Sequence, residues 1–218
     1  MNILKRFGLF ARFGVLACIC TASALAQNVA NYPDNFQLHS SEFVNQGILP
    51  LTAVFNNQVN GVNSCSANGA AGGNQSPELF WTGALWGTQS YMIVLYDVTA
   101  SLTHWGMYNI DGRTMELPAN AGVAGNTYGM QIVNDFNSGT EYNGPCPPAN
   151  VAPEAHQYVF AIYALKATLH LPTSANFPAN KETLYHALIN AGEKGDILGT
   201  ASLTGYYSST PQSSTASK

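Results

Sequence analysis

Two unbroken apolar stretches, residues 91–96 (YMIVLY) and 158–165 (YVFAIYAL), constrain the fold more than any other feature of the chain. A strand with one face in water alternates between apolar and polar residues, whereas a continuous apolar run of strand length indicates burial on both faces. We therefore expect these two segments to be central strands of a sheet that is covered on each side.

Weaker patterns complete a mainly β domain. Further strands are expected at residues 36–40, 48–55, from 76 onward, 104–110 and 197–207. Within 104–110, alternation places two groups of side chains on opposite faces: Trp105 and Met107 on one, and His104, Gly106, Tyr108 and Ile110 on the other. One helix is predicted over residues 180–191, where leucine and alanine recur every three or four positions and Gly192 provides a stop. Residues 56–74 and 119–143 are predicted to be mainly loop.

The first 26 residues have the pattern of an export signal. Lys5 and Arg6 precede an apolar run, and small residues end at Ala26, after which we expect cleavage. The run is short for a retained membrane anchor, and a lipid anchor on Cys18 is a third alternative. The mature protein is then expected in the periplasm or outside the cell. It would comprise a loose lead-in (27–35), a single domain (36–207) and a disordered tail (208–218).

The charge balance argues against nucleic acid as a partner. Once the signal is removed, five scattered basic residues remain beside twelve acidic ones. Phosphate backbones are bound by clustered lysine and arginine, so this pattern is the wrong one. The same excess of negative charge disfavours adhesion to an anionic membrane surface.

Cys65 and Cys146 are the cysteines that remain after signal removal. An even pair in an oxidising compartment favours a disulfide. Two reduced cysteines packed as small apolar residues are the alternative. A thiol nucleophile is less well supported, because Cys146 lies between two prolines and has no basic neighbour to stabilise a thiolate.

Candidate binding residues stand at the expected strand ends. Asp97 directly follows the apolar run 91–96 in a chain where charged residues make up only 9%. His104 and His156 can donate ring N–H groups to an oxyanion, and they become cations near their ordinary pKa of about 6.5. Because Asp97 would repel such an anion, its predicted role is to accept a hydrogen bond from one histidine and fix its tautomer.

Two other groups add donors to this predicted site. Tyr158 supplies a hydroxyl, and the turn at Gly144 and Pro145 can present backbone N–H groups with no side chain in the way. An anion bound there should be held more tightly as the pH falls through the histidine pKa.

Several short motifs occur together in a characteristic order. They are SPELFW (76–81), Asp97, THW (103–105), YNI (108–110), NDF (134–136), GPCPP (144–148), HQYVF (156–160) and the ending ILGTASLTGYY (197–207). In order and spacing they resemble the phosphatidylethanolamine-binding proteins (PEBPs), and in particular the bacterial Raf kinase inhibitor-like branch. The resemblance covers about residues 36–207, and GPCPP with the later His-x-Tyr is its most specific part.

The resemblance implies an antiparallel Greek-key β-sandwich of two sheets with a few flanking helices. It also implies a small, non-catalytic pocket, needing no cofactor, that accepts a phosphate or a similar anion. Carried over by matching positions, the pocket residues would be Asp97, His104, Gly144, Pro145, His156 and Tyr158, with Trp81 lining the pocket.

The chain departs from the family pattern in two places. DVTAS (97–101) stands where the family has Asp-Pro-Asp-x-Pro, and Gln157 stands where the family has arginine. One acid and one base are therefore absent together, which suggests that the two pair in the family fold. The departures bear on phospholipid preference rather than on the pocket itself.

Two other functions are compatible with the sequence. One is a regulatory module that inhibits a partner protein through its surface, although an exported protein would not normally meet a cytoplasmic kinase. The other is a metal-dependent hydrolase that uses Asp97, His104 and His156, but no tight spacing such as His-x-x-x-His supports it. The ligand, a partner protein and a homodimer are left open by the sequence.

Overall fold

The computed structural model describes residues 35–136, 139–171, 173–174 and 178–211. The predicted export signal, most of the lead-in and residues 212–218 of the predicted tail lie outside this part of the chain. Among the described residues, no helix has both the length and the apolar character needed to cross a membrane.

The described elements are mostly strands. They are β1 (Gln37–His39), β2 (Gly47–Ile48), β3 (Gln58–Val59), β4 (Val62–Asn63), β5 (Leu79–Thr82), β6 (Ser90–Asp97), β7 (Leu102–Asp111), β8 (Glu116–Leu117), β9 (Met130–Gln131), β10 (His156–Leu165), β11 (Ile197–Tyr207), one α-helix, α1 (Lys181–Glu193), and a 3-10 turn (Leu51–Ala53). The strands form a six-stranded sheet β2-β11-β10-β6-β7-β9, a three-stranded sheet β1-β5-β8 and the hairpin β3-β4. Pairing is antiparallel except between β2 and β11.

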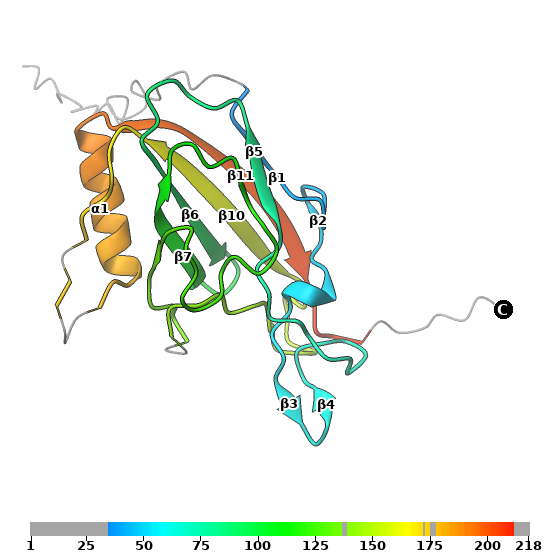
Figure 1. Ribbon diagram of the computed structural model, residues 1–218. Coiled ribbons are helices and arrows are strands. Elements are labelled where there is room, and N and C mark those ends of the chain that lie inside the picture. Colours follow the sequence, from blue (N-terminus) through cyan, green and yellow to red (C-terminus); the bar gives the residue numbers. More distant parts are fainter. Residues whose placement is uncertain (1–34, 137–138, 172, 175–177, 212–218) are drawn as a thin grey trace, which may run out of the picture. The chain divides into compact units, whose positions relative to one another are not determined.

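The six-stranded sheet carries an apolar core on each face. In β6, Tyr91, Ile93 and Leu95 point into the core shared with the three-stranded sheet, while Met92 and Val94 lie in the core shared with α1. Figure 1 shows α1 on one side of this sheet and β1 and β5 on the other. Residues 91–95 are therefore buried on both faces, as predicted, and the mainly β fold with two main sheets is confirmed.

The second central strand, β10, is fully buried on one face only. Tyr158, Phe160 and Ile162 are at most 1% exposed, whereas Val159 and the other residues of the opposite face between 157 and 163 are half-buried. The core beneath α1 reaches Ala161, Tyr163 and Leu165 but not Val159. The prediction of two buried faces was therefore wrong for β10, because the helix covers only one end of the strand.

The helix α1 forms where its apolar pattern predicted. Its buried residues at Leu184, Ala187, Leu188 and Ala191 pack against the sheet. The Asn180 side chain accepts a hydrogen bond from the Thr183 N–H while the Thr183 hydroxyl accepts one from the Asn180 N–H, which is a capping box. The helix continues past the predicted stop at Gly192 and ends before Gly195, whose φ of 71° suits a C-terminal cap.

A bulge in β7 changes the face on which Ile110 lies. The pairing with β6 shifts register between Tyr91 and Ile93, opposite Asn109, whose φ is 57°. Beyond this point the alternation of side chains is reversed, so Ile110 joins Trp105 and Met107 in the core shared with the three-stranded sheet. The simple alternation predicted from the sequence put Ile110 on the opposite face and was wrong.

Two segments before β5 also differ from expectation. Residues 48–55 do not form a strand: β2 ends at Ile48, and Pro50 precedes the 3-10 turn Leu51–Ala53. The predicted loop 56–74 contains the hairpin β3-β4, whose turn residues Asn60 and Gly61 both have positive φ. In Figure 1 this hairpin projects away from the sheets.

Candidate functional site

A cavity of about 380 Å³ opens where β6 ends and where β7 and β10 begin. The strand pairing explains the convergence, because Asp97 of β6 lies opposite both Leu102 of β7 and Tyr158 of β10. The cavity is lined by Phe55, Asn57, Asp97, Ala100, Leu102, His104, Phe136, Asn143, Gly144, Cys146, Pro147, Pro148, His156 and Tyr158. No lysine or arginine is among these described lining residues.

Asp97 is the centre of the polar part of this cavity. Its side chain is buried, and Oδ1 accepts hydrogen bonds from the N–H groups of Thr99 and Ala100, each at 2.9 Å. Its Oδ2 accepts a hydrogen bond from Nδ1 of His156 at 2.8 Å and lies 3.9 Å from Nε2 of His104. The predicted hydrogen bond from one histidine to Asp97 is thus present, and it comes from His156.

His104 is turned toward the cavity by a second irregularity in β7. Leu95 pairs with Trp105 and Tyr96 pairs with Thr103, so His104 stands between two paired residues without an opposite partner of its own. Its Nδ1 donates to the carbonyl oxygen of Asn143 at 2.8 Å. Burial lowers the pKa of His104 below its ordinary value, although the Asn143 carbonyl and the Asp97 charge act in the opposite direction.

These contacts determine the tautomers of both histidines. A carbonyl oxygen and a carboxylate can only accept, so Nδ1 carries the proton in His104 and in His156. In the neutral form of each ring, Nε2 therefore has a lone pair and accepts hydrogen bonds. Either ring must gain a proton before Nε2 can donate to an oxyanion.

Tyr158 lies between the two imidazoles. Its ring is 5.3 Å from that of His104 in an edge-on arrangement and 6.4 Å from that of His156 in a stacked one. Burial, followed by the negative charge of Asp97 and a hydrogen bond to its side chain, raises the pKa of the Tyr158 phenol. Its hydroxyl therefore keeps its proton and remains able to donate a hydrogen bond.

Gly144 lines the cavity but does not supply the donor that the sequence predicted. Its N–H already donates to Oδ1 of Asn74 at 2.8 Å, and proline at 145 has no N–H. A side chain at Gly144 would meet the carbonyl oxygen of Ala53 at 2.1 Å, so glycine is required for this close approach. Pro145 is not among the lining residues, and its carbonyl oxygen accepts from the Phe55 N–H at 3.1 Å.

Trp81, predicted to line the pocket, lies in the core between the sheets. It is 2% exposed, and its ring contacts that of Tyr91 edge-on at 5.0 Å. The carry-over from the family motif is therefore not supported by the position of Trp81. Its alternation along β5 directs it to the core shared by the two main sheets.

Mostly apolar residues form the rest of the wall. Phe136, expected near the rim, is 42% exposed and its ring lies 4.7 Å from that of His104. Phe55 and Asn57 were missed, because they belong to the segment after the 3-10 turn and lie far from the motifs in sequence. Only their long-range contacts bring them to the cavity, so no local pattern could have identified them.

The two positions that depart from the family pattern are neighbours in space. The Gln157 N–H donates to Oγ1 of Thr99 at 2.9 Å, and the Val98 N–H donates to the Gln157 carbonyl at 2.9 Å. This proximity agrees with the hypothesis that an acid and a base at these positions pair in the fold of the family that the motifs resemble.

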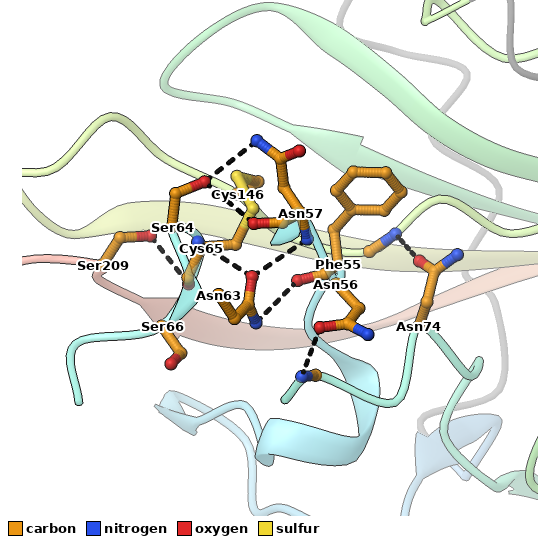
Figure 2. The surroundings of a disulfide bond; sticks show 12 residues. Phe55, Asn56, Asn57, Asn63, Ser64, Cys65, Ser66, Asn74, Cys146 and Ser209 are labelled. Carbon is orange, nitrogen blue, oxygen red and sulfur yellow. Dashed lines mark hydrogen bonds between the residues drawn. A yellow bond between two sulfur atoms is a disulfide. The ribbon is translucent and has the colours of Figure 1, made fainter. Parts of the chain in front are cut away.

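The cavity wall is joined to the loop 56–74 by a disulfide. Cys65 and Cys146 are bonded, with their Cα atoms 4.6 Å apart, as the sequence favoured (Figure 2).

The hydrolase alternative predicted a metal held by Asp97, His104 and His156. Within the described residues, no group of three or more His, Cys, Asp and Glu side chains has an arrangement suited to a metal ion.

Comparisons with known proteins agree with this architecture. The family described as phosphatidylethanolamine-binding protein matches residues 39–208. The UPF0098 protein YbcL of Escherichia coli is 32% identical over 180 residues, which cover 79% of this chain and 87% of YbcL. A UPF0098 protein of Methanothermobacter thermautotrophicus is 34% identical over 140 residues, covering 62% of this chain and 84% of that protein.

Solved structures agree as well. The crystal structure of E. coli YbcL, described as a new member of the mammalian PEBP family, aligns with a TM-score of 0.62 and 29% identity. That alignment covers 80% of this chain and 98% of YbcL. A PEBP homologue of Chlamydia trachomatis, CT736, shares the fold with a TM-score of 0.58 and 24% identity over 79% of this chain and 96% of its own. The chain therefore belongs to the phosphatidylethanolamine-binding protein family, in its YbcL-like bacterial branch.

Proposed function

We propose that the cavity binds a small phosphate-containing anion, without chemical turnover, and that it does so with its histidines protonated. The observation that carries this proposal is the arrangement of His104 and His156 around Oδ2 of Asp97 in a cavity lined by no described lysine or arginine. The imidazoles are the groups that can turn this site from an acceptor into a donor of hydrogen bonds.

The electrostatics make binding depend on pH. At neutral pH the buried carboxylate of Asp97 repels an anion, and the low pKa of His104 keeps that ring neutral. As the pH falls, protonation of His104 adds a positive charge and an Nε2–H donor beside Tyr158. A bound anion in turn favours the charged imidazoles, so binding takes up protons.

Phosphoethanolamine titrations at about pH 7.5 and about pH 5.5 test this reasoning, with heat or histidine NMR signals as the readout. We expect affinity to rise at least about tenfold at the lower pH, and His104→Asn and His156→Asn to remove the rise. His186→Asn, at an exposed position on α1, is the matched control. Sulfate, whose charge is constant over this range, separates protonation of the protein from that of the ligand. A flat pH profile with both anions would contradict the proposal.

Whether the phosphate belongs to a lipid headgroup or to a free small molecule can be tested with the same protein. Vesicles of phosphatidylethanolamine present the phosphate as a lipid headgroup, and free phosphoethanolamine presents it in solution. Binding to both supports a lipid ligand, whereas binding to free phosphoethanolamine alone supports a soluble one. The predicted export signal and the disulfide support a place for this activity outside the cytoplasm.

A further inference from the structure

The disulfide is part of the wall of the candidate site. Cys146 is exposed and lines the cavity between Gly144 and Pro147, whereas Cys65 is completely buried in the loop 56–74. Three other lining positions, Phe55, Asn57 and Gly144, are held by the same loop or by its flanks. The bond therefore joins the cavity wall at Cys146 to the loop 56–74, which also positions several other residues of the wall.

Hydrogen bonds on two sides also hold this wall in place. On one side, the Asn143 backbone and His104 exchange two hydrogen bonds, from the His104 ring at 2.8 Å and to its carbonyl at 3.3 Å. On the other, the Phe55 N–H donates to the Pro145 carbonyl and the Gly144 N–H donates to Asn74. Because Asn143 adjoins residues 144–148, a displacement of these residues would act on the carbonyl group that orients the His104 ring.

The loop has little apolar packing of its own. Among residues 56–74, Cys65 is the one buried apolar side chain, and the hairpin residues Val59 and Val62 are exposed. A buried amide organises the interior: Asn63 accepts from the N–H groups of Asn57 and Cys65 and donates to the Phe55 carbonyl (Figure 2). Without the disulfide, the loop would be held to the wall by hydrogen bonds such as that from the Gly144 N–H to Asn74, and the Ser209 hydroxyl would still donate to the Cys65 carbonyl. Single hydrogen bonds contribute little individually.

We propose that the Cys65–Cys146 disulfide positions the anion cavity and couples its affinity to redox state, so that reduction weakens ligand binding. The inference rests on the proposed function for its ligand. In the reduction, a dithiol attacks the exposed Cys146 side of the bond, the S–S bond breaks, and two cysteine thiols and an oxidised dithiol are formed. Two electrons and two protons pass from the dithiol to the protein.

Linkage makes the coupling reciprocal. If reduction weakens binding by a given factor, ligand binding must favour the oxidised form by the same factor. A tenfold loss of affinity therefore requires the reduction potential of the disulfide to fall by about 30 mV when the ligand is saturating. A disulfide that contributes only to global stability would leave this potential unchanged by ligand.

The first measurement compares phosphoethanolamine binding by the oxidised, reduced and Cys65→Ser/Cys146→Ser proteins at about pH 5.5. We expect affinity to fall at least about tenfold in both proteins that lack the bond. The second measures the dithiol redox equilibrium of the wild-type chain with and without phosphoethanolamine, and so does not depend on a variant that folds. Equal affinities together with equal potentials would overturn the proposal.

A readout without ligand separates this proposal from the proposed function. If the oxidised protein fails to bind phosphoethanolamine, phosphate and the vesicles, the proposed function is wrong. Hydrogen exchange of the Gly144 amide then decides whether the disulfide positions the wall. Exchange at least about tenfold faster on reduction supports positioning, with the Gly106 amide of β7 as reference, and unchanged exchange overturns it.

Discussion

Replacing Asp97 separates its role as a hydrogen-bond acceptor from its role as a charge. The buried carboxylate accepts from two backbone N–H groups and from Nδ1 of His156. Asp97→Ala leaves these three donors, and the Tyr158 hydroxyl, without their acceptor, whereas Asp97→Asn keeps an oxygen for the N–H groups of Thr99 and Ala100 and loses the charge. The two variants should therefore differ both in their free energy of unfolding and in the tautomer of His156.

The size of the difference follows from the number of donors left unpaired. Breaking a buried, hydrogen-bonded charge typically costs about 3–5 kcal/mol, and we expect about 4 kcal/mol for Asp97→Ala. Retaining two of the three bonds should limit the loss in Asp97→Asn to about 1–2 kcal/mol. Urea unfolding at neutral pH measures both values, and Asp111→Asn, in an ion pair exposed to solvent, provides a control with little expected effect.

A second measurement reports the tautomer of His156 directly. If Oδ1 of residue 97 keeps its two backbone donors, the new amide nitrogen faces Nδ1 of His156 and donates to it. His156 must then move its proton from Nδ1 to Nε2, which nitrogen chemical shifts of the ring detect. Equal stability losses in the two variants, or an unchanged His156 tautomer in Asp97→Asn, would refute this account of the site.

Three further predictions concern other contacts. Burial lowers the pKa of His104, so the unfolded chain binds its proton first and stability should fall as the pH drops below about 6.5; the His104→Asn variant should show a shallower fall in urea midpoint. The double variant Thr99→Asp/Gln157→Arg should have a free energy of unfolding about 0.5–1 kcal/mol higher than the sum of the two single-variant effects predicts. Strict additivity of the two effects would exclude pairing. Asn109→Gly keeps the positive φ but loses two hydrogen bonds to Leu169, so unfolding should show a loss of about 1–3 kcal/mol; an unchanged value would contradict the role of Asn109 as an anchor.

Local patterns predicted the elements that depend on local causes. The apolar run that became β6, the spacing of Leu184 and Ala187 in α1, and the strand β11 follow from burial and periodicity within one segment. Pro50 and the Asn60-Gly61 turn were visible signals that the expectation of a strand at 48–55 and a plain loop at 56–74 did not use. The disulfide was favoured by the even cysteine count together with the predicted export to an oxidising compartment.

Sequence motifs predicted the residues of the candidate site only in part. Motif positions indicated Asp97, His104, Gly144, His156 and Tyr158, and all five line one cavity. They could not indicate which partner takes the Gly144 N–H, because Asn74 comes from a segment distant in sequence. The same holds for Trp81, whose placement in the core depends on how two sheets face each other.

By itself, the sequence determined the family, the central strand, the helix and the residue types available for chemistry, because these depend on composition and on spacing along the chain. The tertiary structure alone decided that the bulge at Asn109 moves Ile110 to the other face, and that both histidines hold their protons on Nδ1. The physical reason is the same in each case. Register and hydrogen-bond partners are set by contacts between segments far apart in sequence, and our proposal that protonation precedes anion binding rests on those contacts.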